Sequence, residues 1–97
     1  MTAAARIRDT LAAALAPVRL AVHDDSHRHA GHAGARPGGE THFRVEVVSA
    51  RFVGLNRLAR QRLVYGLLSA ELHGGVHALQ LTTLTPEEDA RQSAKTP

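Results

Sequence analysis

The feature that most constrains the fold of this chain is a pair of alternating segments joined by a long segment without periodicity. Apolar and polar residues alternate over Val18–His23 and again over His42–Val47, as they do in half-buried β-strands. The segment between them, Asp24–Glu40, is rich in glycine, histidine and charge and has no apolar repeat. We therefore predict two antiparallel strands around a long loop, a kind of connection that commonly carries function.

Two helices are predicted around this pair of strands. In Thr2–Ala16 apolar residues recur every four positions and Pro17 ends the run. A longer helix is expected over Leu55–Leu72, after a turn at Phe52-Val53-Gly54 and before Gly74-Gly75. One side of the longer helix carries Leu58, Val64, Tyr65, Leu68 and Leu72, and Leu63 and Leu67 lie about a quarter turn away. This helix is therefore either buried on two sides or offers an apolar patch to a partner.

A third strand and a final helix complete the domain. Val76–Thr83 has the alternation of a strand. Thr85 is followed by Pro86 and, three residues after Thr85, by Glu88, a pattern that starts a helix. We predict an α/β sandwich with the order α-β-β-α-β-α, in which a three-stranded mixed sheet has its helices on one face. We expect residues 1–90 of the 97-residue chain to form one domain, with the loop 24–40 inserted between the first two strands. Residues 91–97 are expected to form a flexible tail.

Composition narrows the chemistry that such a domain can perform. The chain has no cysteine and seven histidines, so thiolate nucleophiles, disulfides and a self-sufficient cysteine metal site are excluded. The formal net charge of +3 is modest, and nucleic-acid binding is permitted but not required. No apolar run approaches the roughly 20 residues of a membrane-spanning helix, and we expect a cytoplasmic protein without a membrane partner.

Three runs of sequence resemble the BolA family. They are DDSHRHAGH, then THFRVEVVSARFVGLNRLARQRLVY, then ELHGGVHALQLTTLTPEE, and together they cover about Val18 to Glu88. The resemblance implies an α/β sandwich similar to the type II KH domain, which agrees with the predicted element order. It also implies a partner, a monothiol glutaredoxin, with which BolA-like proteins can share a [2Fe–2S] cluster. The isolated chain would then hold no cofactor and would be a monomer or a weak homodimer.

The resemblance also implies the ligands of that cluster. The partner's cysteine and a glutathione thiolate would hold one side, and two residues of this chain would hold the other. One is His77, in the Val-His-Ala-Leu segment of the last strand, and the other falls on His29 in the loop. His42 matches a family histidine beside this site, whereas His32 has no clear counterpart, and the choice of loop ligand between His29, His27 and His32 stays open.

Imidazole chemistry fits such a half-site. Neutral imidazole is a good ligand for iron, and clusters held by two histidines and two thiolates exist in Rieske-type centres. Each histidine also has a structural interpretation. His77 shares strand parity with Leu79 and Leu81, so the alternative is a histidine at the edge of the core that hydrogen-bonds a backbone carbonyl. The loop histidines are ordinary residues for a solvated segment. His23 and His73 are expected at the surface.

The second function class is nucleic-acid binding, as a DNA-binding transcriptional regulator that uses the KH-like fold, because some BolA-like proteins regulate transcription. The relevant stretch is Gly54 followed by Arg57, Arg60 and Arg62, where cations near a helix N-terminus can contact phosphates. KH domains use a Gly-x-x-Gly loop, and only Gly54 is present here. Family members often carry Arg-His-Arg in this helix, where the chain has Arg60-Gln61-Arg62.

An enzymatic function is not expected. Asp24, Asp25, Ser26 and His27 contain the residue types of a hydrolytic triad, but they are consecutive in a loop and define neither a pocket nor an orienting geometry.

Overall fold

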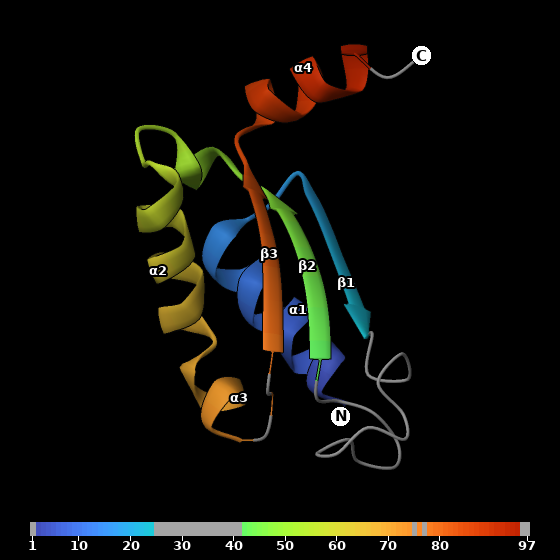
Figure 1. The fold of residues 1–97 in the computed structure, drawn as a ribbon, viewed down its shortest axis with the longest axis vertical. Helices are drawn as coiled ribbons and strands as arrows, with labels where there is room; N and C mark the ends of the chain where they lie inside the picture. The colour runs from blue at the N-terminus through green and yellow to red at the C-terminus, as the bar shows by residue number, and fades with distance from the viewer. Residues whose placement is uncertain (1, 25–41, 75, 77, 96–97) are drawn as a thin grey trace.

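Three strands form one sheet in the order β1-β2-β3, and the helices pack around it (Figure 1). The structure is a computed structural model that describes residues 2–24, 42–74, 76 and 78–95. Strand β1 (Arg19–Asp24) pairs antiparallel with β2 (His42–Val48), and β2 pairs parallel with β3 (Ala78–Leu84). The predicted mixed sheet and the antiparallel pairing of the first two strands are therefore confirmed.

The core lies on one face of the sheet. Phe43, Val45 and Val47 alternate along β2 and are 2%, 1% and 0% exposed. Helix α1 (Ala3–Leu15) places its own apolar stripe, Ile7, Leu11 and Leu15, in the same cluster. Burial of each such side chain contributes about 1.5–3 kcal/mol to stability, so this shared cluster supplies much of the stability of the fold.

The ends of α1 are fixed by local hydrogen bonds. The Thr2 hydroxyl accepts a 3.1 Å hydrogen bond from the backbone N–H of Ala5 and caps the helix. At the other end Ala16 adopts a left-handed conformation with φ 42°, and its N–H donates to the Ala12 carbonyl. Pro17 cannot continue the helix, so the chain turns directly into β1.

The predicted single helix over Leu55–Leu72 is wrong in two respects. It starts later, because Asn56 is the N-cap and accepts a 2.8 Å hydrogen bond from the Ala59 N–H. It is also divided into α2 (Arg57–Leu67) and α3 (Ser69–His73), with Leu68 between them at φ −100° and ψ 15°. The division lies two residues after Gly66, and glycine weakens a helix interior. Leu68, the residue at the division, is only 1% exposed.

The apolar residues of α2 and α3 divide differently from the prediction. Val64 and Leu68 are buried, and Leu63, Leu67 and Leu72 pack partly buried against the same core. Leu58 and Tyr65, which were assigned to the same side, are 54% and 39% exposed. The buried side is thus centred between the two predicted apolar groups, which explains why both contribute to the core.

Helix α4 (Pro86–Lys95) lies across one end of the sheet (Figure 1). Its start has the predicted reciprocal caps, because the Thr85 N–H donates to Glu88 Oε1 at 2.8 Å and the Glu88 N–H donates to Thr85 Oγ1 at 3.2 Å. The helix includes residues 91–95, which the sequence analysis assigned to a tail. Helices α1 and α2 cover the apolar face of the sheet as predicted, whereas α4 occupies an end.

Side chains of α2 contact the edge strand β3. The Tyr65 hydroxyl donates to the Leu79 carbonyl at 3.2 Å, and Arg60 donates to the Thr83 carbonyl at 3.2 Å. The backbone carbonyls of successive residues in β3 point alternately toward β2 and away from it. The Leu84 carbonyl points toward the β2 side, because it accepts a 2.9 Å hydrogen bond from the Ser49 N–H. The carbonyls of Leu79 and Thr83 therefore lie on the free edge, where α2 supplies their donors.

Candidate functional site

Three chain segments meet at the end of the sheet opposite α4. Strand β1 ends there at Asp24, and β2 and β3 both begin there, at His42 and Ala78. The register makes His42 and Ala78 Cα partners, and Asp24 is the partner of Phe43. His42 is half-buried on β2. Its partner on β3, Ala78, is the residue that directly follows position 77 in the chain.

Most of the predicted cluster ligands lie outside the described residues. They are His29 and His77, together with the alternative loop ligands His27 and His32. Of the candidate ligands only His42 is described. Among the residues that the structure places, no group of three or more histidines, aspartates or glutamates lies close enough to hold a metal ion. The ligand assignment therefore stays a prediction.

The donor set of the chain fits half of a mixed-ligand cluster site. With no cysteine the chain has no thiolate to offer to an iron–sulfur cluster, and its nitrogen ligands are the neutral imidazoles of its seven histidines. A cluster with two imidazoles on one iron requires two thiolates from elsewhere on the other iron. The chain can supply the first pair and cannot supply the second.

The structure describes two other histidines, one next to Asp24 on β1 and one on α3, an element that also lies at this end of the sheet (Figure 1). His23 is exposed on β1, and His73 is exposed in the last turn of α3, both as expected from the sequence. Of the four consecutive residues that contain the types of a hydrolytic triad, Asp24 is the last residue of β1 and the other three lie outside the described residues.

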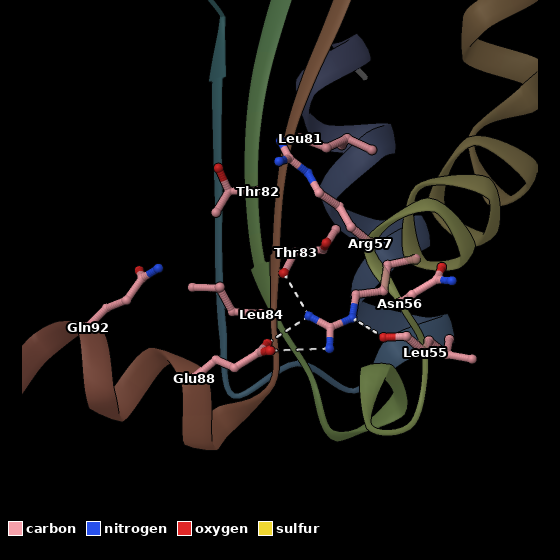
Figure 2. Close-up of a pocket in the computed structure, with 10 residues that line it drawn as sticks. Leu55, Asn56, Arg57, Leu81, Thr82, Thr83, Leu84, Glu88 and Gln92 are labelled. Atoms are coloured by element: carbon pink, nitrogen blue, oxygen red, sulfur yellow. Dashed lines mark hydrogen bonds and ion pairs between the residues drawn. The ribbon is translucent and has the colours of Figure 1, made fainter.

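Arg60, predicted as a phosphate contact, is occupied inside the fold. Its Nε donates to the Leu55 carbonyl at 2.8 Å, and its Nη1 donates to Glu88 Oε1 at 2.7 Å as well as to the Thr83 carbonyl. The guanidinium also lies 5.8 Å from the centre of the Phe52 ring, and the Arg60 side chain is only 12% exposed. Arg60 therefore links α2, β3 and α4, and its charge is neutralised by Glu88. The dashed lines in Figure 2 reach the labelled Leu55, Thr83 and Glu88.

Glu88 is correspondingly held in its charged form. The hydrogen bonds from Arg60 and then from the Thr85 N–H lower the pKa of the Glu88 carboxyl from 4.5 to about 2. A similar pair lies on the other side of α4, where Arg19 contacts Asp89 at 2.6 Å and Glu46 at 3.0 Å. The hydrogen bond to Asp89, followed by the one to Glu46, raises the pKa of Arg19.

Three other arginines near the N-terminus of α2 remain exposed. Arg51, Arg57 and Arg62 make no ion pair within the described part of the chain. Gly54, at φ 83°, allows the turn between Phe52 and α2. A cavity of about 460 Å³ opens between this turn, β3 and α4, and Arg57 and Asn56 lie on its wall (Figure 2).

Two functional features of this region were not predicted from the sequence. The first is the N-cap of α2, where Asn56 accepts a hydrogen bond from the Ala59 N–H. Its residue type was the available signal, because asparagine is favoured at the N-cap. The pairing of Arg60 with Glu88 has no local signal, because the two residues are 28 positions apart.

Comparison with known proteins identifies the family. The family model described as BolA-like protein matches residues 11–88, so the chain belongs to the BolA-like family. The chain is 49% identical over 87 residues to protein BOLA1, chloroplastic, of Arabidopsis thaliana, covering 88% of this chain and 54% of that protein. The chain thus spans about half the length of this curated relative.

Solved structures agree with this assignment. The structure of BolA1 from Arabidopsis thaliana superposes with a TM-score of 0.82 at 47% identity, covering 91% of this chain and 96% of that chain. The BolA domain of SufE1 from the same organism superposes with a TM-score of 0.79 at 46% identity, covering 88% and 93%. The mixed α/β fold with a three-stranded sheet is therefore the fold of this family. Within the described residues, no helix is both long and apolar enough to span a bilayer.

Proposed function

We propose that this protein is a non-enzymatic adaptor of the cytoplasm that pairs with a monothiol glutaredoxin and co-ligates a [2Fe–2S] cluster through histidines. The proposal places His29 and His77 as the ligands from this chain, with His42 beside them. The glutaredoxin cysteine and glutathione would supply the two thiolates. The pair would act in iron–sulfur trafficking or in iron and redox regulation.

The register of the sheet is the observation that carries this proposal. Because His42 and Ala78 are Cα partners, the strand that follows position 77 begins beside the strand that follows the histidine-rich loop. Strand β1 ends at the same end of the sheet, so both termini of that loop are anchored there. A half-site that needs one ligand from the loop and one from before β3 is compatible with this topology.

The family relationship gives further support. One structural relative is the BolA domain of a protein named SufE1, and this chain is similar to that domain over nearly its whole length. When bound, a cluster with imidazole ligands would be released by acid, because ligation needs deprotonated imidazole.

Spectroscopy of the reconstituted pair tests the proposal. The chain and a monothiol glutaredoxin are mixed with glutathione, iron and sulfide without oxygen, and visible absorption and circular dichroism are recorded. His29→Ala and His77→Ala are expected to change the visible circular dichroism, whereas His73→Ala, an exposed histidine on α3, is the matched control. His27→Ala and His32→Ala distinguish the alternative loop ligands.

Two results would contradict different parts of the proposal. If no complex forms with any monothiol glutaredoxin, the adaptor function is wrong. If the complex forms and His29→Ala and His77→Ala both give the parent spectrum, the partner is right and the ligand assignment is wrong.

We infer DNA binding as the second candidate function, supported by Arg51, Arg57 and Arg62, which form no ion pair with any residue that the structure describes. No acidic residue lies in the first turn of α2, and Arg57 occupies that turn, where a cation is unfavourable next to the positive end of the helix dipole. A bound phosphate would offset this repulsion. Arg60 does not take part in this version of the proposal, because Glu88 holds it.

A gel-shift titration at two salt concentrations tests the second candidate. Arg57→Gln with Arg62→Gln is expected to weaken binding and to reduce the salt slope by about 0.9 for each lost phosphate contact. Arg8→Gln, an exposed arginine on α1, is the control and should leave both quantities unchanged. Absence of any shift at micromolar protein in low salt would exclude this function.

A further inference from the structure

Helix α4 is attached to the domain almost entirely by polar contacts. None of the side chains described in this helix, at residues 86–92, is buried. The nearest buried residue is Thr85, which precedes the helix and is 8% exposed. The hydrophobic effect therefore contributes little to holding α4 in place, in contrast to α1, whose apolar stripe is fully buried.

Two ion pairs replace the missing apolar contact. Glu88 contacts Arg60 of α2 at 2.7 Å, and Asp89 contacts Arg19 of β1 at 2.6 Å. The two acidic residues are adjacent in the first turn of α4, but their partners belong to elements on different sides of the helix. Glu87, in the same turn, forms an ion pair within its own helix, with Arg91 at 3.9 Å, and none with another described element.

We propose that α4 is an electrostatically latched arm, held by Glu88 and Asp89, which detaches from the sheet and unfolds when these two ion pairs are broken. Detachment and unfolding are linked because isolated helices shorter than about 12–15 residues are marginal in water, and α4 has 10 residues. Release uncovers Leu84, which borders a pocket with Glu88, Arg91 and Gln92, and leaves the guanidinium groups of Arg19 and Arg60 without the carboxylates of α4.

The charged groups around the latch define how it opens. Glu88 faces Arg60 and the Thr85 N–H, and Asp89 faces Arg19, which is shared with Glu46. Salt weakens both pairs together, since the screening length falls from about 10 Å at 0.1 M to about 3 Å at 1 M. Acid opens the Glu88 side only well below neutral pH, because the pKa of that carboxyl is about 2.

Hydrogen exchange of the full chain tests the latch. Glu88→Gln removes the charge but keeps a residue that can cap Thr85, so the helix start is preserved while the pair with Arg60 is weakened. Asp89→Asn weakens the other pair, and Glu87→Gln is the matched control in the same turn. The amides of α4 in Glu88→Gln are expected to exchange about tenfold faster than in the parent, while those of β2 keep their rates.

Trypsin cleavage after Arg91 is the second measurement, since the protease needs an unfolded segment. Cleavage is expected to accelerate in Glu88→Gln and Asp89→Asn, and in the parent at 1 M salt relative to 0.1 M, but not in Glu87→Gln. Equal rates of exchange and cleavage for Glu88→Gln, Asp89→Asn and Glu87→Gln would overturn the proposal. So would a parent protein whose α4 amides exchange at the same rate in low and high salt.

Discussion

The hydroxyl of Ser49 donates a 2.6 Å hydrogen bond to the backbone carbonyl of Leu15, which joins the end of β2 to the end of α1 across 34 positions of sequence. Ser49 is 0% exposed, and its Oγ also accepts a 3.1 Å hydrogen bond from the Arg51 N–H. One small side chain thus satisfies two backbone groups, of which the hydrogen bond to Leu15 is buried and the one from Arg51 is partly buried.

Ser49→Ala is expected to destabilise the protein by about 1–3 kcal/mol, because it leaves a buried carbonyl and an N–H without their partner. Urea unfolding followed by far-ultraviolet circular dichroism measures this free energy. Ser69→Ala, at an exposed position that starts α3, should change stability by less than about 0.5 kcal/mol. Equal effects of the two substitutions would show that the hydrogen bond to Leu15 is unimportant.

The leucines of the helices are expected to differ sharply in their contribution to stability. Leu11 is 0% exposed between α1 and the sheet, so Leu11→Ala should cost about 2–5 kcal/mol through lost burial and the cavity that remains. Leu58 is 54% exposed on α2, and Leu58→Ala should cost less than about 0.5 kcal/mol. Chemical denaturation of both variants checks the difference, and comparable midpoints would contradict the placement of the core.

Two glycine substitutions are expected to have opposite signs. A Cβ at either Gly54 or Gly66 would meet no atom within 4 Å, so the backbone alone decides the effect. Gly54 has φ 83°, where an L-residue is strained, and Gly54→Ala should destabilise by about 1–2 kcal/mol. Gly66 lies in α2 with ordinary helical geometry, and Gly66→Ala should stabilise by about 0.5–1 kcal/mol. Melting temperatures that move in the same direction would contradict this reading.

The contribution of Glu88 should depend on pH with a defined sign. Its pKa is about 2 in the folded protein against 4.5 without its partners, so the unfolded state binds the proton more readily. The stabilising effect of Glu88 is therefore fully present above about pH 4.5 and is lost as the pH falls from there toward 2. Unfolding of the parent and of Glu88→Gln should give a stability difference that shrinks over this window. A difference that is the same at pH 7 and pH 2.5 would argue against the pair with Arg60.

The element order was predictable because periodicity and local caps specify it. The alternation of β2, the four-residue repeat of α1 and the reciprocal caps of Thr85 and Glu88 are all local patterns, and all are confirmed. The break at Leu68 was missed because three- and four-residue spacing continues through it. Gly66 was the available signal, since glycine weakens a helix interior.

The site was less predictable because its contacts are long-range. Sequence reasoning placed Arg60 on a phosphate-binding surface, whereas its charge is neutralised by Glu88, 28 residues later in the chain. No local pattern distinguishes Arg60 from Arg57 or Arg62, which remain exposed. His29 and His77 were assigned from family motifs, and their roles stay predictions.

The free edge of β3 has a consequence for the behaviour of this protein at high concentration. An edge strand with unpaired backbone groups can template pairing with a second chain and so start aggregation. Here Tyr65 and Arg60 donate hydrogen bonds to the carbonyls of Leu79 and Thr83, and their bulky side chains stand where an incoming strand would have to lie. Helix α2 thereby hinders the pairing of a second chain with the β3 edge of the sheet.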